Sequence, residues 1–451
     1  MNFLRYELKL LWRQPATRWL AAAFLLLMTL ATWQSQRQVE QTQAHLAELR
    51  RTEAQQRADL VTQLLAIELS PSLAPAEQNP QIPYETGGRL AVQHVGKAPA
   101  PLAALSRGHS AFFAPAYPVS VGNAQLFAPL MSDDNLSHPN QHLFARLDPA
   151  FVLIWLLPFW VMAMTYGLLS AEREQGTLPL LRAQPLSQGK WLLGKLLIRF
   201  GLIAGLACAF VLVAGLLAGV PVFSQPLETL KVLGLVAGYA LFWGVLALGI
   251  NLLGKSSAFN AGALFAAWVG LVLVLPALLN LAAERQFPLP SRLELVHEMR
   301  ETELDLSLRI EQAMSSFYLA HPELAPDDEQ QKMPYWQYQL ALKKRKSAEA
   351  SRPLVEAYYA QQAARTQWLA QWRWVSPAIF LQDELDRVAG TSHADYLAFL
   401  QRVDAANAEW REIFFRKIFK DAYMTAAEVA ALPRWSQGDE AFTSPPHLTA
   451  Q

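Results

Sequence analysis

Long apolar runs alternate with polar stretches along this chain. Four apolar runs lie at about 149–170, 191–220, 230–253 and 259–282, and each approaches or exceeds the ~20 residues with which an α-helix crosses a bilayer. A shorter run at 16–33 precedes them and carries Arg18 near its start, where a long side chain can reach the lipid head groups. The pattern predicts five membrane spans.

The polar stretches predict three further parts. Residues 1–15 alternate apolar and basic side chains at helical spacing, which indicates an amphipathic helix in the membrane interface. Residues 34–148 begin as a helix that continues beyond the membrane and then become rich in Pro and Gly, so a small mixed domain with short strands near 89–94 and 119–127 is expected. Residues 283–451 have helical periodicity and few glycines, and they predict helices near 291–318, 334–351, 353–374 and 392–420.

The predicted fold is therefore mainly α. A polytopic helical membrane bundle, formed by 16–33 and 149–282, carries a cytoplasmic link at 171–190. The α-rich C-terminal domain, 283–451, and the smaller mixed domain, 34–148, lie outside the membrane.

The positions of Lys and Arg predict which side of the membrane each link faces. Positive residues near span ends are Arg5, Lys9, Arg13, Arg173, Arg182, Lys190, Lys195 and Lys255. The short link 221–229 contains none. We therefore expect a multi-pass protein of the inner (cytoplasmic) membrane, with the N-terminus and 171–195 in the cytoplasm and both large domains extracytoplasmic.

The composition is typical of a membrane protein and limits the classes of partner to expect. Hydrophobic residues make up 52% of the chain and charged residues 17%, against about 25% charged in a typical soluble domain. Lys plus Arg and Asp plus Glu are equal at 38 each, so no net charge favours nucleic acid as a partner. The single cysteine, Cys208, cannot form an intramolecular disulfide, so packing alone must hold the domains. No signal-peptide cleavage site follows the first apolar run.

Glycines recur at four-residue spacing within the spans. The pairs are Gly201/Gly205, Gly215/Gly219 and Gly234/Gly238. Small residues at this spacing let membrane helices approach closely, although the general enrichment of glycine in such helices explains any single pair about as well.

Catalytic and ligand-binding chemistry is not indicated. Residues 249–256 match the pattern of a phosphate-binding loop, but they end a membrane-length apolar run instead of linking a strand to a helix. His138 and His142 are four apart, yet Pro139 lies between them and no third ligand is near. Mid-span ionisable residues are absent, which disfavours an ion-coupled carrier. We expect no cofactor, no metal site and no enzymatic activity in this chain.

The link 171–190 has a different character, because it is short, polar and amphipathic. Leu178, Leu180, Leu181 and Leu186 supply an apolar face, while Gly176 bounds one end. Such a face predicts docking against a partner, and an ordinary solvated loop is the alternative.

At this link the sequence resembles a known family. The run Glu172-Arg173-Glu174-Gln175-Gly176-Thr177-Leu178, with Leu180-Leu181, Pro185, Ser187 and Gly194-Lys195, is similar to the signature of permease subunits of ATP-binding-cassette exporters of the second type. The resemblance covers about 145–285. Weaker landmarks at 376–381 and 432–435 resemble a subgroup with large extracytoplasmic insertions, in which a sixth span normally follows, although no apolar run follows residue 435 here. Pro179 departs from the usual residue of the motif, so a helix is expected only after it.

The resemblance implies a function and partners. The chain would be a non-enzymatic transport subunit, with ATP hydrolysed by a separate cytoplasmic ABC ATPase, and it would pair with a second permease subunit, identical or related, among membrane lipid. The ATPase-coupling residues would be Glu172, Arg173, Glu174, Gly176, Thr177, Leu178, Leu180, Leu181, Pro185 and Ser187. The alternative function is a membrane-tethered scaffold or sensor whose outer helical domain binds a ligand or a protein.

Overall fold

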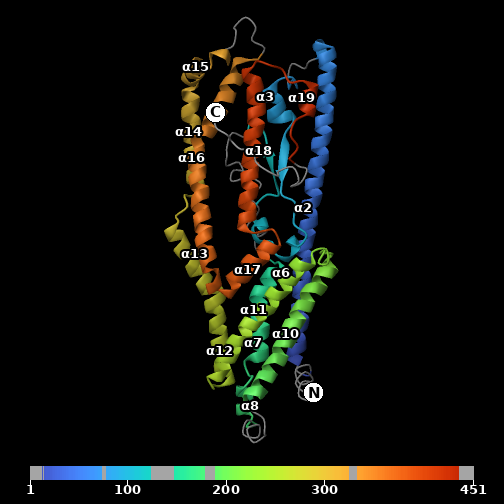
Figure 1. The fold of residues 1–451 in the computed structure, drawn as a ribbon, viewed down its shortest axis with the longest axis vertical. Helices are drawn as coiled ribbons and strands as arrows, with labels where there is room; N and C mark the ends of the chain where they lie inside the picture. Colours follow the sequence, from blue (N-terminus) through green and yellow to red (C-terminus); the bar gives the residue numbers. More distant parts are fainter. Residues whose placement is uncertain are drawn as a thin grey trace.

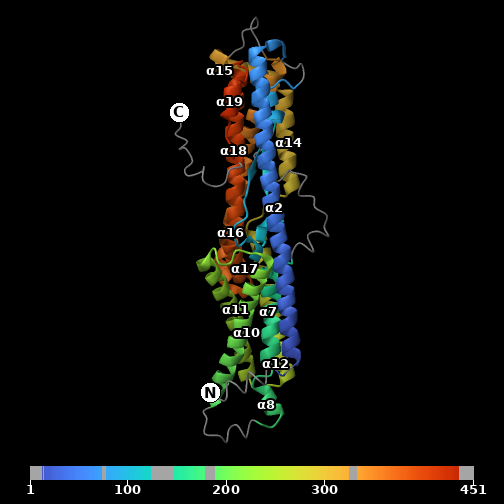
Figure 2. The same ribbon diagram turned by 90° about the vertical axis from the view of Figure 1, so that its right-hand side faces the viewer.

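A 55-residue helix, α2 (Pro15–Leu69), runs along most of the molecule. At ~1.5 Å per residue it extends for about 80 Å. The computed structural model describes residues 13, 15–73, 78–122, 147–177, 188–324 and 333–435. Figures 1 and 2 show an elongated molecule with a bundle of helices at one end and a second helical part at the other, both lying along α2. The expected interfacial helix, 1–15, lies almost wholly outside the described residues.

The bundle consists of helices that follow one another closely in the chain. Its elements are α6 (Pro149–Phe151), η6 (Val152–Leu156), α7 (Leu157–Thr165), α8 (Ser170–Glu174), α10 (Gln188–Ala218), α11 (Pro226–Leu252), α12 (Ser257–Trp268), η7 (Val269–Val274) and α13 (Leu275–Gln286). Both η6 and η7 are π-helical turns, each followed within a few residues by a proline, Pro158 or Pro276. Because proline has no N–H to donate, the regular hydrogen-bond ladder is interrupted there.

Four helical stretches are long and apolar enough to cross a membrane, among the residues that the structure describes. They are Pro149–Glu174, Gly194–Ala218, Pro226–Leu252 and Ser257–Gln286. The second to fifth predicted spans are thereby confirmed as candidate spans, and they indicate a multi-pass membrane protein.

The remaining expected span, 16–33, is the N-terminal part of α2 and is not one of these four stretches. Among the described residues four of the five predicted spans are therefore candidate spans, and the first span, 16–33, stays a prediction. This part of α2 nevertheless packs into the bundle, because Phe24 and Met28 are buried in the bundle core and the Phe24 ring lies 5.2 Å from that of Trp160. The prediction that α2 continues as a helix past residue 33 is confirmed.

The second helical part, here called the extramembrane part, combines residues from α2, from 78–122 and from the C-terminal half. Its elements are η1 (Pro71–Leu73), α3 (Pro83–Glu85), η2 (Thr86–Leu90), β1 (Gln93–Gly96), η3 (Ala103–Leu105), η4 (Gly108–Ala111), β2 (Ala116–Val119), α14 (Arg292–Leu308), α15 (Ile310–Ala320), η8 (Pro322–Leu324), α16 (Tyr335–Trp372), η9 (Arg373–Val375), α17 (Pro377–Val388), α18 (His393–Phe419) and α19 (Ala426–Ala430). The two strands pair antiparallel, with Gln93 opposite Val119.

Several predicted boundaries in this part are wrong. The strands lie at 93–96 and 116–119, displaced by a few residues from the expected 89–94 and 119–127, and residues 123–127 lie outside the described residues. The helix expected at 291–318 is interrupted at Arg309, whereas the two helices expected on either side of Arg352 are one helix, α16, with Pro353 inside it. Because α16 packs against α13, α14 and α18, tertiary contacts outweigh the loss of one backbone hydrogen bond at the proline.

Two hydrophobic cores hold the molecule together. The bundle core is built from α2, α7, α10, α11 and α12, and α17 joins it through Ala378, Leu381 and Leu385. The outer core surrounds α18, whose Phe399, Trp410 and Phe414 are fully buried. The Ser376 hydroxyl, just before α17, donates to the carbonyl oxygen of Leu271 in η7 at 2.8 Å. The bundle and the extramembrane part are therefore joined by side-chain contacts as well as by the chain itself.

The glycine pairs do not mark the close helix contacts of this chain. A Cβ atom built at Gly201, Gly205, Gly234 or Gly238 would meet nothing within 4 Å, so these positions do not pack another described helix against their own. At Gly215 it would meet Val222 at 3.0 Å, while Gly219, at φ +80°, lies directly after α10. The tightest approach is at Gly244 of α11, where a Cβ would lie 1.6 Å from the ring of Phe200 in α10. Gly244 was missed because it belongs to no glycine pair.

Candidate functional site

The link between the second and third predicted spans is described over its first part, at the tip of the bundle (Figures 1 and 2). The short helix α8 leads directly to Gly176 and Thr177. Five of the ten predicted coupling residues lie in this described part: Glu172, Arg173, Glu174, Gly176 and Thr177. The other five, Leu178, Leu180, Leu181, Pro185 and Ser187, lie outside the described residues.

Glu172 connects α8 to α10. One carboxylate oxygen of Glu172 accepts from the ammonium of Lys195 at 2.9 Å, and the other accepts from the hydroxyl of Thr177. Lys195 is buried, and one turn further along α10 the guanidinium of Arg199 donates to the carbonyl oxygen of Met164 at 2.6 Å. A charge-assisted hydrogen bond to a buried ammonium is stronger than a solvent-exposed ion pair. The start of α10 is therefore fixed both to α8 and to α7.

Arg173 and Glu174 connect α8 to the turn between α11 and α12. The guanidinium of Arg173 donates to the carbonyl oxygen of Gly254. The carboxylate of Glu174 accepts from the backbone N–H of Ser257 at 2.7 Å and from its hydroxyl at 2.9 Å. Ser257 is the first residue of α12, where free backbone N–H groups and the helix dipole favour a negative charge. Adjacent residues of α8 thus hold different helices.

A second layer of polar groups lies deeper in the bundle. The side-chain oxygen of Asn251 accepts from the N–H of Leu169 at 3.3 Å and from the side-chain amide of Asn260 at 3.1 Å. The Asn251 amide group donates to the carbonyl oxygen of Thr165 at 3.0 Å, and the Ser170 and Ser257 hydroxyls lie 2.7 Å apart. Both asparagines are fully buried. In an apolar environment such groups need partners, so they fix how α7, α11 and α12 meet.

Sequence reasoning missed Lys195 as a partner of Glu172, and it missed the role of both asparagines. The available signal was their position: Asn251 and Asn260 interrupt otherwise apolar runs on the two sides of Gly254-Lys255. Their contact required the fold, because the facing residues come from the end of α7 and are more than 80 positions away in the chain.

The contacts of this network hold helices together. Among the residues that the structure describes, no group of three or more His, Cys, Asp or Glu side chains has the arrangement of a metal site. The network ties α8 to α10, to α12 and to the turn between α11 and α12.

Comparison with known proteins adds one match. Residues 292–437 match the family described as "Domain of unknown function (DUF3526)". The matched segment begins at α14 and contains none of the four candidate spans. No curated protein and no solved structure matches the chain.

Proposed function

We propose that this chain is the membrane subunit of an ATP-driven exporter of the ATP-binding-cassette class, second type. A separate cytoplasmic ATPase supplies the energy, and a second permease subunit, identical or related, completes the transporter. The α8 end then faces the cytoplasm of a cell with the chain in its inner membrane, and the extramembrane part faces outward. The observation that carries the proposal is the double attachment of α8, through Glu172 to α10 and through Glu174 to α12.

The sequence motif and this attachment support the proposal together. The motif that resembles the coupling segment of such permeases begins at Glu172, and its first residues are those that bind the neighbouring helices. A partner that pushes on 178–187 therefore acts on a segment held firmly at its N-terminal side. The force would pass through Lys195 and Ser257 into α10 and α12, while the extramembrane part receives cargo or an outer partner.

The first test removes the expected docking face. In the doubly substituted chain Leu178→Glu/Leu181→Glu, two apolar side chains become charged, and we expect loss of copurification with the cognate ATPase. Membrane insertion and yield should be unchanged, since both positions lie in the link. Normal copurification with normal ATP-dependent transport by the variant contradicts the coupling function.

The second test separates force transmission from docking. Glu172→Lys and Lys195→Glu each place like charges together, so each should keep the ATPase bound but reduce coupled ATP hydrolysis by about tenfold. The combined exchange, Glu172→Lys/Lys195→Glu, restores opposite charges and should recover a large part of the activity.

The matched control uses the ion pair Glu228–Lys231, which is 2.7 Å long and lies at the other end of α11. Charge reversal there should leave hydrolysis unchanged. Equal losses at both pairs, or no recovery in the combined exchange, would show that the Glu172–Lys195 bond transmits nothing.

A further inference from the structure

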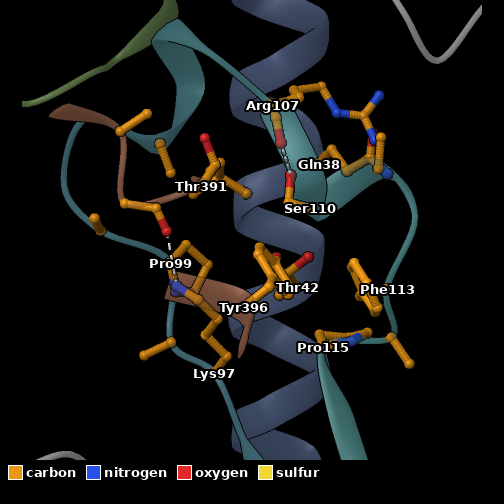
Figure 3. Close-up of a pocket in the computed structure, with 18 of the residues that line it drawn as sticks. Gln38, Thr42, Lys97, Pro99, Arg107, Ser110, Phe113, Pro115, Thr391 and Tyr396 are labelled. Atoms are coloured by element: carbon orange, nitrogen blue, oxygen red, sulfur yellow. Dashed lines mark hydrogen bonds between the residues drawn. The ribbon is translucent and has the colours of Figure 1, made fainter. Parts of the chain in front are cut away.

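A cavity of about 510 Å³ opens beside α2 in the extramembrane part. Figure 3 shows it with α2 behind and with loop residues from 97–116 and the turn before α18 around it. Residues Ser35, Gln38, Val39, Thr42 and His45 of α2 line it, and their spacing places them on one face of the helix. Ser35 lies one turn past Ala31, a residue of the bundle core, so the cavity begins about 6 Å beyond that core.

The charges that line the cavity are all of one sign. Lys97 and Arg107 line it, together with His45, and no Asp or Glu occurs among its described lining residues. The Lys97 ammonium donates to the carbonyl oxygen of Gly390 at 2.8 Å and lies 5.1 Å from the centre of the Tyr396 ring. It is thereby held at the wall of the cavity.

The buried carboxylate of Asp148 lies next to Arg107, outside the cavity lining. Asp148 is not a lining residue, and it accepts from the backbone N–H groups of Arg107 at 2.9 Å and of Phe151 at 2.7 Å. Burial raises the pKa of Asp148 and lowers that of Arg107, but an arginine stays protonated in proteins. The Asp148 carboxylate therefore lies beside Arg107 but outside the lining, and the described lining itself contains cationic and no anionic side chains.

Much of the rest of the wall is apolar, and many of its residues are small. It includes Ala98, Pro99, Ala100, Ala103, Ala111, Ala114, Pro115, Ala116 and Ala389. The rings of Phe113 and Tyr396 stack at 5.1 Å between centroids and both line the cavity, while Phe112 is half exposed beside them. Small side chains leave the volume open, and a ring pair offers a flat apolar surface. Ligand sites of this size combine an apolar lining with a few placed polar groups.

We propose that this cavity binds an amphipathic organic anion, with its negative group beside the ammonium of Lys97 and its apolar part against the alanine–proline wall and the Phe113–Tyr396 pair. The hydroxyl group of Thr42 also lines the cavity and can donate to the same anion, whereas those of Ser110 and Thr391 already donate to the carbonyl oxygens of Arg107 and Ser106. The anion is either a free solute or the head group of a lipid, because both present the same chemistry. Binding requires no ATPase, so its test is independent of the proposed function.

The experiment uses the full chain in an uncharged detergent and naphthalene-2-sulfonate as the probe, with binding measured by equilibrium dialysis. We expect saturable binding of one probe per chain. The matched neutral compound, 2-naphthol, and the cation 1-naphthylmethylammonium should bind at least about tenfold more weakly, because they lack the attraction to the Lys97 ammonium. Absence of saturable binding, or equal binding of the three compounds, overturns the proposal.

Two substitutions at one position separate charge from shape. Thr42→Glu brings a carboxylate to the cavity wall and should raise the dissociation constant of the sulfonate about tenfold or more, whereas Thr42→Gln, of nearly equal size, should change it by less than about threefold. Lys97→Gln should weaken binding similarly to Thr42→Glu, and Lys346→Gln, on the exposed face of α16, should have no effect. Equal affinities of Thr42→Glu and Thr42→Gln would place the probe elsewhere.

Competition then identifies the source of the anion. Displacement of the probe by the short-chain lipid dihexanoyl phosphatidylglycerol, but not by octanoate, assigns the cavity to a lipid head group. Displacement by octanoate but not by the lipid assigns it to a free amphipathic acid. Displacement by neither, at concentrations well above the dissociation constant of the probe, would contradict an anion site.

Discussion

Helices α11 and α18 are each 27 residues long, but they differ in which side chains they bury and which they expose. In α18 the buried face includes the large apolar residues Phe399 and Trp410, and the exposed positions carry Ala, Gln and charged residues. In α11 the buried face combines the small residues Ala240 and Gly244 with the ring of Trp243, and other large apolar residues point away from the chain. Leu241 and Val245 are more than half exposed.

The physical reason is the solvent on the far side of each helix. Around α18 water makes the burial of apolar area favourable, at ~25 cal/mol per Å², so polarity decides which face is inside. Between the helices of a membrane bundle lipid is as apolar as leucine, and helices associate through close packing and polar contacts. Apolar residues therefore lie on both faces of α11, and its inside is set by how side chains fit together, as at Gly244 and Trp243, and by polar pairs such as Asn251–Asn260.

The largest expected effect tests the close packing of the bundle. In Gly244→Val the new Cβ would lie 1.6 Å from the Phe200 ring, so α10 and α11 cannot keep their spacing. We expect loss of monodisperse protein in size-exclusion chromatography after detergent extraction. Gly238→Val, at a position of the same helix that meets nothing within 4 Å, should behave like the wild type.

A second-site change sharpens this test. Phe200→Ala removes the ring that the introduced valine side chain would strike, so the combination Gly244→Val/Phe200→Ala should recover monodisperse protein. If the combination fails and Gly238→Val fails equally, the space between α10 and α11 does not decide the fold of the bundle.

The next effect concerns the outer core. Trp410→Ala removes a fully buried ring and the hydrogen bond that its indole N–H donates to the carbonyl oxygen of Gly87 at 2.8 Å. We expect a loss of about 3–5 kcal/mol in the free energy of unfolding of the extramembrane part. Hydrogen exchange measured by mass spectrometry should show lost protection in α18 and in 84–96, with the bundle unaffected.

Trp374→Ala provides the matched control, because its ring is two-thirds exposed. It should cost less than about 1 kcal/mol. A comparable loss from both tryptophans would mean that burial of large rings does not stabilise this part.

A third effect concerns the junction of the two cores. Asp386 of α17 accepts from the Ser106 hydroxyl and from the Gln382 amide group, the latter at 2.8 Å, and burial raises its pKa from 3.8 to about 7. Between these two pH values the folded chain keeps a proton that the unfolded chain releases. Stability from this group is thus complete below pH 3.8 and decreases as the pH rises towards 7, by at most about 1.4 kcal/mol per pH unit.

Asp386→Asn removes the titration while its side-chain oxygen can still accept both hydrogen bonds. In thermal unfolding in detergent from about pH 4.5 to 8, the melting temperature of Asp386→Asn should rise relative to that of the wild type as the pH increases. Above about pH 7 the difference between the two melting temperatures should be constant. Asp305→Asn, in an exposed ion pair of α14, should show no such trend. A parallel pH dependence of wild type and Asp386→Asn would contradict the buried state of this carboxyl group.

Prediction from sequence succeeded where a local pattern reports the surroundings of a segment. The four candidate spans lie within a few residues of their predicted positions, because the length of an apolar run is itself a membrane signal. The periodicity of α18 was similarly visible, since its apolar face is set by water. For Gly201, Gly205, Gly234 and Gly238 no contact lies within the described chain, and their part in helix packing stays a prediction, because a small residue in a membrane helix reports neither its partner nor its direction.

For the candidate site, too, the sequence predicted one part and not the other. The motif at 172–178 marked the link as a coupling segment, and that function remains a prediction. The binding of Glu172 to Lys195, of Glu174 to Ser257, and of Asn251 to Asn260 could not be derived, because each requires the relative position of separate helices.

The sequence by itself determined the helical, multi-pass character of this protein and the place of its polar links, since both depend on runs of residues that meet one solvent or the other. The tertiary structure alone decided which residues meet across the bundle, that α16 continues through Pro353, and that loops from 97–116 close a positively charged cavity against α2. These features arise from contacts between residues far apart in the chain, whose energies no local pattern contains.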